Sequence, residues 1–177
     1  MNFKLAISSF LLMVSFLSYG VEVSLEQYRL GSGDIVKISV FGEDDLSLET
    51  RLPQTGIISY PFLGDIKAVD LTVSALEKYI FDGLKGDYLI SPSVSVTVIQ
   101  YRPFFIDGEV KKPGGYPYQP GLSVDKASAL AGGYTERASK SKIVIVRDIS
   151  GLQSTLFAQS SDIVFPGDII TIQQSFF

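Results

Sequence analysis

The first residues that could do chemistry form a glycine-rich stretch, Gly31-Ser32-Gly33-Asp34, directly before an apolar segment. A phosphate loop of the Walker type needs a longer glycine spacing that ends in Gly-Lys-Ser/Thr, and a dinucleotide loop needs a third glycine ahead of a helix. This stretch has neither, and a strand-like alternation follows it. We therefore interpret it as a turn that starts a strand, with Asp34 accepting hydrogen bonds from nearby backbone amides.

The sequence carries few of the groups that usually perform catalysis. It contains no histidine and no cysteine, so the commonest general base, the thiol nucleophile and ordinary zinc ligands are all missing. The run Glu43-Asp44-Asp45 could bind calcium, but it lacks the alternating spacing of a calcium loop, and a solvated turn is the favoured interpretation. No carboxylate pair of the kind that cuts glycans stands out. We expect no catalytic residue, no cofactor and no metal site.

Aromatic residues gather in the second half of the chain and could contact a ligand. Aromatic rings stack on sugars and fill pockets at interfaces, but they also fill small cores and pair across strands. Both interpretations stay open, with Phe104 and Phe105 expected in a core. Tyr116, Tyr118 and Tyr134 are the candidates for contact with a glycan or a partner. The neighbouring Lys111-Lys112 is interpreted as an exposed hairpin tip.

The N-terminus resembles a secretory signal peptide. Lys4 precedes an apolar run over 5–17, and Ser18-Tyr19-Gly20 places small residues before a cleavage site after Gly20. An uncleaved anchor is the alternative, although the run is shorter than the ~20 residues that span a bilayer. No cysteine follows the site, so lipidation is not expected. We predict a chain exported to the periplasm.

The net charge of the chain argues against nucleic acid as a partner. Without residues 1–20 the chain loses one lysine and carries 14 basic and 19 acidic residues, a net charge of −5. Binding to nucleic acid through bulk charge is therefore disfavoured. With no cysteine for disulfides, stability must come from core packing.

Hydrophobic periodicity predicts an α+β fold in two small units. In the first unit, strands are expected at 35–40, 57–60 and 94–98, with a helix that starts after the cap residue Thr72. Its apolar face is predicted from the 3.6-residue period. The members of that face are Val73, Leu76, Tyr79, Ile80 and Leu84.

The second unit is expected to begin near Pro103. Strands are predicted at 104–106, 143–146 and 169–172, a turn at 112–115, and a short helix at 124–130 that Gly132-Gly133 ends.

Three motifs of the first unit resemble the polysaccharide-export domain of Wza-type outer-membrane polysaccharide exporters. Tyr28-Arg29-Leu30-Gly31-Ser32-Gly33-Asp34 fits its opening, and Gly56-Ile57-Ile58-Ser59-Tyr60-Pro61-Phe62-Leu63-Gly64 fits its second motif. Tyr88-Leu89-Ile90-Ser91-Pro92-Ser93-Val94-Ser95-Val96 fits the third, with one extra residue before the proline.

The second unit is similar to the SLBB module, which implies a β-grasp-like fold. The matching motifs are Gly108-Glu109-Val110-Lys111-Lys112-Pro113-Gly114, Ala131-Gly132-Gly133-Tyr134-Thr135-Glu136-Arg137-Ala138 and Pro166-Gly167-Asp168. The expected organisation is a signal peptide at 1–20, an export domain at 21–101 and an SLBB domain at 102–177.

The resemblance implies a function in capsular or exopolysaccharide export. Such proteins form periplasmic rings that conduct polysaccharide outward from an inner-membrane polysaccharide co-polymerase. This chain shows no C-terminal pore helix, so we expect a short form that works as a homo-oligomeric ring near the outer membrane with a separate outer-membrane β-barrel. The terminal Ser175-Phe176-Phe177 is expected to pack on a neighbour or on the SLBB core.

Two other classes of function stay open. The chain could be a periplasmic glycan-binding module without a conduit role, or an enzyme acting on the polymer, which the missing catalytic groups disfavour.

Overall fold

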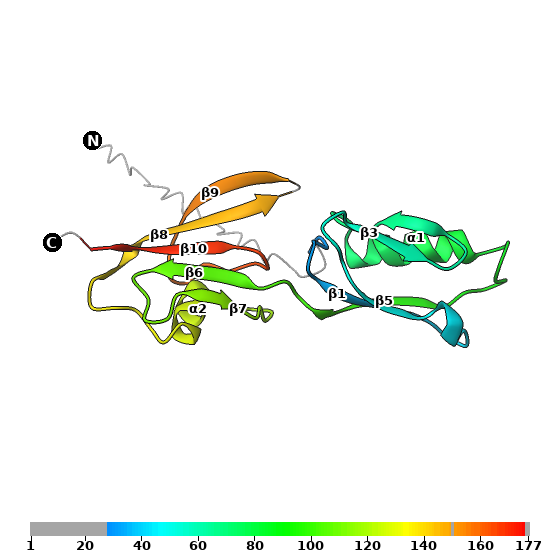
Figure 1. Ribbon diagram of the computed structural model, residues 1–177, viewed down its shortest axis with the longest axis horizontal. Helices are drawn as coiled ribbons and strands as arrows, with labels where there is room; N and C mark the ends of the chain where they lie inside the picture. The colour runs from blue at the N-terminus through cyan, green and yellow to red at the C-terminus, as the bar shows by residue number, and fades with distance from the viewer. Residues whose placement is uncertain (1–27, 150, 176–177) are drawn as a thin grey trace, which may run out of the picture.

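The computed structural model describes residues 28–149 and 151–175, which form two units arranged end to end (Figure 1). The predicted signal peptide and the terminal Phe176-Phe177 lie outside the described residues. Each unit has strands and one α-helix, so the fold is α+β as the periodicity predicted. Among the described residues, no helix is both long enough and apolar enough to cross a membrane.

The first unit packs one helix against two small antiparallel sheets. The three-stranded sheet has the order β2-β1-β5, and β3 pairs with β4 in a hairpin. The elements are β1 (Ile35–Val40), a 3-10 turn (Asp44–Leu46), β2 (Leu48–Arg51), β3 (Ile57–Tyr60), β4 (Gly64–Lys67), α1 (Val73–Leu84) and β5 (Val94–Gln100).

The helix of this unit starts and packs as its sequence predicts, with one exception. The Thr72 hydroxyl accepts a hydrogen bond from the Ala75 amide at 3.1 Å, which caps α1. Leu76, Ile80 and Leu84 are buried. Tyr79 was expected on the same face but is 52% exposed, because it lies at the edge of the apolar stripe. That part of the prediction is wrong.

The second unit is a five-stranded sheet with one helix. The strand order is β7-β6-β10-β8-β9, and β10 runs parallel to β6 in the centre of the sheet. The elements are β6 (Phe104–Gly108), β7 (Gly114–Tyr116), α2 (Val124–Leu130), β8 (Ala138–Ile149), β9 (Leu152–Ala158) and β10 (Ile169–Gln174).

The sequence placed α2 and the central strands of this unit correctly and mistook one turn and one core residue. The predicted turn at 112–115 overlaps β7, a three-residue edge strand. Phe104 is buried as expected, whereas Phe105 points to the opposite face of β6 and is half-exposed. The expectation that Phe105 fills the core is therefore wrong.

Each unit has its own hydrophobic core, and Tyr101 contacts both. The first core gathers side chains between Tyr28 and Val96, the second between Phe104 and Ile172. The exact boundary near residues 101 and 102 stays a prediction.

Candidate functional site

The glycine-rich turn of the first unit surrounds a fully buried carboxylate. Asp34 accepts a hydrogen bond from the Gly31 amide at 2.8 Å and from the Tyr28 hydroxyl at 2.6 Å. The predicted bond to a nearby backbone amide is thereby confirmed. A buried carboxylate costs free energy unless it is hydrogen-bonded and paired with a cation, so its remaining partner matters.

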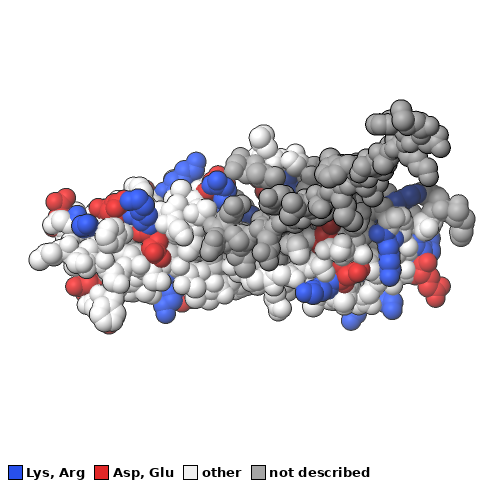
Figure 2. Space-filling model, turned by 180° about the vertical axis from the view of Figure 1, so that it is seen from behind, with Lys and Arg blue, Asp and Glu red and all other residues white. Residues whose placement is uncertain are grey.

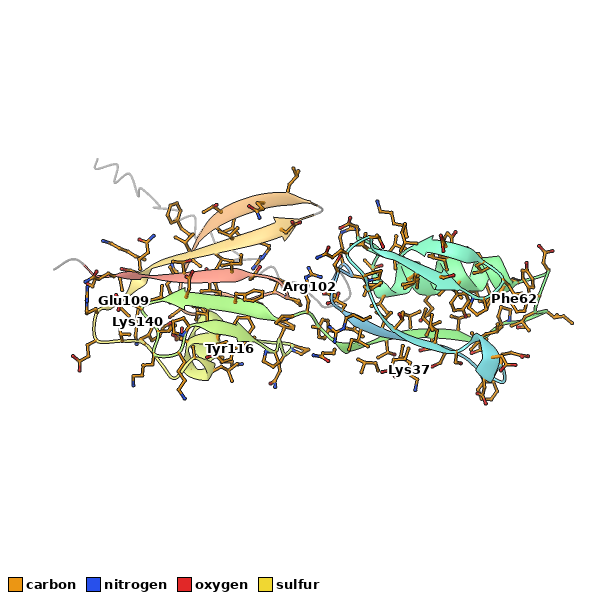
Figure 3. All side chains as sticks on the ribbon, viewed as in Figure 1. Lys37, Phe62, Arg102, Glu109, Tyr116 and Lys140 are labelled. Carbon is orange, nitrogen blue, oxygen red and sulfur yellow. The ribbon has the colours of Figure 1, made fainter. Side chains whose placement is uncertain are left out.

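That partner is Arg102, the residue that follows the first unit. Its backbone amide donates to Asp34 Oδ1 at 2.7 Å, and its Nη1 donates to the Tyr28 hydroxyl at 2.8 Å and to Asp34 Oδ2 at 3.3 Å. Figure 3 labels Arg102 where the two units meet. The connection between the units thus neutralises the charge buried in the first.

The same arginine lies against glycines of both units. A Cβ on Gly31 would overlap its guanidinium, and a Cβ on Gly167 would lie 2.7 Å from its Nε. A side chain at either position would have to displace the Arg102 guanidinium from its present place. Arg102 is therefore clamped between a turn of each unit.

The turn in the second unit repeats the arrangement of the first. Asp168 is fully buried, and Arg147 on β8 donates to its two carboxylate oxygens from Nε and Nη2 at 2.8 and 2.7 Å. The Phe165 amide adds a bond at 2.8 Å. Two parallel bonds from one guanidinium fix both partners in orientation. Each Gly-Asp turn thus holds a buried acid that an arginine from another segment satisfies.

The buried Asp34 also affects the tyrosine that contacts it. Burial, followed by the nearby Asp34 carboxylate, raises the pKa of Tyr28 far above its ordinary value of 10.0. Tyr28 therefore stays neutral and keeps its hydroxyl as a donor to Asp34.

A cavity of about 660 Å³ lies at this junction, lined by residues of both units that include Arg29, Arg102 and Arg147. Each guanidinium already donates to a protein oxygen: Arg29 to the Asp70 carbonyl, and the other two to the buried acids. The cavity wall is thus made largely of groups that hold the junction together.

Two family models match this chain in the order of its two units. The polysaccharide biosynthesis/export protein model covers residues 22–99, and the SLBB domain model covers residues 103–158. The chain belongs to the polysaccharide biosynthesis/export protein family. Arg102 falls between the two matched ranges.

Two curated proteins are similar to this chain in sequence. The chain is 36% identical over 122 residues to the exopolysaccharide production protein ExoF of Rhizobium meliloti, covering 61% of this chain and 28% of that protein. It is 27% identical over 183 aligned positions to the EPS I polysaccharide export outer membrane protein EpsA of Ralstonia nicotianae, covering 83% and 47%. The chain thus spans less than half the length of these relatives.

In this export-family chain, the three predicted contact tyrosines lie in different surroundings. Tyr118 is 7% exposed and packs edge-on against Tyr101, an arrangement that favours a role in the core. Tyr116, labelled in Figure 3, stacks on Phe104 and donates to the Lys112 carbonyl. Tyr134 donates to Asp125 Oδ1 at 2.8 Å. A glycan or partner contact by any of the three stays a prediction.

The charged groups considered from the sequence lie at the surface. Glu43, Asp44 and Asp45 are exposed around the 3-10 turn, and within the described residues no three potential ligands cluster to hold a metal. Lys and Arg are interspersed with Asp and Glu on the face of the first unit in Figure 2.

Sequence reasoning missed Arg102 and Arg147. A signal was available for Arg102, because a lone arginine between two units, each with a Gly-Asp turn, is a natural cation for a buried acid. For Arg147 the alternation of β8 shows only a charged residue near a strand end, and its partner lies 21 positions away.

Proposed function

We propose that this chain is a periplasmic component of an exopolysaccharide export machine, assembled as a homo-oligomeric ring that conducts polysaccharide toward the outer membrane. The observation that carries the proposal is the succession of an export domain and an SLBB domain in one chain. Both curated relatives bear names that refer to exopolysaccharide production or polysaccharide export. The role is transport rather than catalysis, since the family is an export family.

The Arg102 junction suits a ring made of stacked tiers. Two units in one subunit can contribute to two tiers only if their relative orientation is the same in every copy. A buried acid satisfied from the connecting residue supplies such an orientation. Partners at the two membranes, an inner-membrane co-polymerase and an outer-membrane β-barrel, are further parts of the proposal.

Secretion and assembly provide separate tests. Deleting the gene in its source organism should abolish extracellular polysaccharide, and the chain supplied in trans should restore it. Normal secretion in the deletion strain would contradict the export role. Native mass spectrometry of the chain, alone and with co-expressed partners, should show a closed oligomer. A monomer under both conditions would contradict the ring and favour a glycan-binding module without a conduit.

A further inference from the structure

An exposed pair of aromatic rings lies at the end of the first unit that faces away from the junction. The rings of Phe62 and Tyr88 stack with centroids 4.7 Å apart and planes 25° apart. Phe62 is 64% exposed and Tyr88 46% exposed. Figure 3 labels Phe62 at this end. The two rings come from different connections, the β3–β4 turn and the α1–β5 loop.

The backbone at Phe62 takes an unusual conformation to present its ring. The Leu63 amide donates to the Pro61 carbonyl at 2.8 Å, which closes a three-residue turn centred on Phe62. Phe62 has φ of +64°, and a γ-turn with a positive central φ is rare and strained. A strained, exposed aromatic residue persists only where its surroundings enforce it, and such residues gather at binding sites.

The surroundings that enforce the turn are visible. Leu63 packs on the core of the first unit, and a Cβ on Gly83 of α1 would lie 2.8 Å from its Cδ2. Leu63 is thus anchored on the helix while Phe62 points outward. Tyr88 supports the Phe62 ring, which stays largely exposed to solvent.

From this arrangement we propose that the Phe62–Tyr88 pair binds a neutral pyranose unit of a polysaccharide. The proposal rests on the proposed function, which supplies a glycan as the cargo. The C–H groups on one face of a pyranose match the face of a single aromatic ring, and a neighbouring phenol can bond a sugar hydroxyl. Among the described residues, the Tyr88 hydroxyl makes one hydrogen bond, a 3.5 Å donation to the Phe62 carbonyl, and so it can turn to a ligand.

The charges near the pair select a neutral sugar over an acidic one. Among the described residues, the loops at this end carry exposed Glu43, Asp44, Asp45 and Asp87 against a single Lys85. The Phe41 amide donates to the Ser93 carbonyl at 2.9 Å, so the acidic connection and the Tyr88 loop are neighbours. A uronate would meet repulsion there, whereas an uncharged pyranose would not.

Titrations with defined oligosaccharides test the site. The purified chain would be titrated with cellohexaose, maltohexaose and an alginate hexamer while amide chemical shifts are followed by NMR. We expect saturable, weak binding of a neutral hexasaccharide with shifts at Phe62 and Tyr88, and no saturation with alginate. Phe62→Ala should weaken binding about tenfold, because it removes the stacking surface.

Two further variants keep the test decisive. Phe62→Gly removes the ring but suits the positive φ, so it should fold at least as stably as the wild type and still lose binding. Phe157→Ala removes an 89% exposed phenylalanine from the second unit and should leave affinity unchanged. Unchanged affinity in Phe62→Gly, or no saturable binding of either neutral hexasaccharide by the wild type, would overturn the site.

Failure of the site and failure of the export role give different results. If the deletion strain loses secretion but Phe62→Gly binds sugars like the wild type, the site is wrong and the export role stands. If the deletion strain secretes normally while Phe62→Gly loses sugar binding, the export role is wrong and the chain binds glycan for another purpose.

Discussion

Asp34 and Asp168 show how single buried charges determine which residues surround them. Neither carboxylate is reached by water, so each must be satisfied by donors from the protein. Asp34 accepts hydrogen bonds from the Tyr28 hydroxyl, from an amide of its own turn and from Arg102. Asp168 accepts them from both Nε and Nη2 of the Arg147 guanidinium. Removing one partner of a buried ion pair leaves the other charge uncompensated, which makes these residues sensitive to substitution.

The raised pKa of Tyr28 predicts a loss of stability in alkali. Above pH 10 the unfolded chain loses the Tyr28 proton while the folded chain keeps it, so the unfolded state binds fewer protons. The free energy of unfolding should then fall as pH rises, by up to about 1.4 kcal/mol per pH unit from this residue. Urea unfolding of the wild type and Tyr28→Phe at several pH values checks this.

The substituted chain should behave differently in two respects. Tyr28→Phe should be less stable at neutral pH by about 1.5–3 kcal/mol, because it loses a hydrogen bond to a buried carboxylate. Its stability should also decline less steeply above pH 10. If the free energy of unfolding fell equally steeply with pH above pH 10 in the wild type and in Tyr28→Phe, the role given to Tyr28 would be contradicted.

At the scale of elements, local patterns predicted the regular segments well. β1, β3, α2 and the Thr72 cap of α1 follow from alternation, the 3.6-residue period and capping chemistry. The sequence did not predict β2, β4, β7 or β9 as strands. β7 is three residues of mostly glycine at an edge, and β9 has mixed burial because it lies on the opposite edge, so neither shows a clean period.

Strand pairing could not be predicted either. The neighbours β6 and β10 are separated by about 60 positions and run parallel, and only the folded core brings them together. The Phe62–Tyr88 pair was missed for a similar reason, since exposure and stacking across two loops leave no local pattern. Arg102 could have been inferred, but the distances that join it to both turns could not.

Gly108, at the end of β6, gives a prediction at this scale. It has φ of +79°, and a Cβ would overlap the Ile172 carbonyl on the neighbouring β10. Gly108→Ala should therefore lower the free energy of unfolding by about 3 kcal/mol or more, because strain and a backbone clash act together. Thermal and urea unfolding measure the change.

Gly121 is a matched control for backbone strain alone. Its φ is +77°, and a Cβ added there would meet no described atom within 4 Å. Gly121→Ala should cost only about 1 kcal/mol. A Gly108→Ala change as small as this would show that β6 and β10 can separate slightly at no great cost.

At the scale of the whole molecule, Arg102 connects the two units, because it is hydrogen-bonded to the buried acid of the first and lies against Gly167 of the second. Arg102→Met should lower the free energy of unfolding by about 2–3 kcal/mol, because Asp34 loses its cation. It should also widen the distribution of angles between the units. Residual dipolar couplings measured for each unit, together with small-angle scattering, would detect that change.

Lys78→Met is the control for the loss of any ion pair. Lys78 and Asp82 form an exposed pair on α1 at 2.6 Å, which contributes little to stability. This variant should change the free energy of unfolding by no more than about 0.5 kcal/mol. It should leave the orientation of the units unchanged. If Arg102→Met also left the orientation of the two units unaltered, the two cores and Tyr101 would be enough to hold that orientation without Arg102.

The position of Arg102 also bears on how the protein can be divided. A cut after Tyr101, at the border between the two sequence patterns, would leave the first unit with a buried carboxylate stripped of an amide donor and its cation. The first unit is then not self-sufficient where its sequence pattern stops. Exchanging one unit between family members requires the residue at this position to travel with the acid it neutralises.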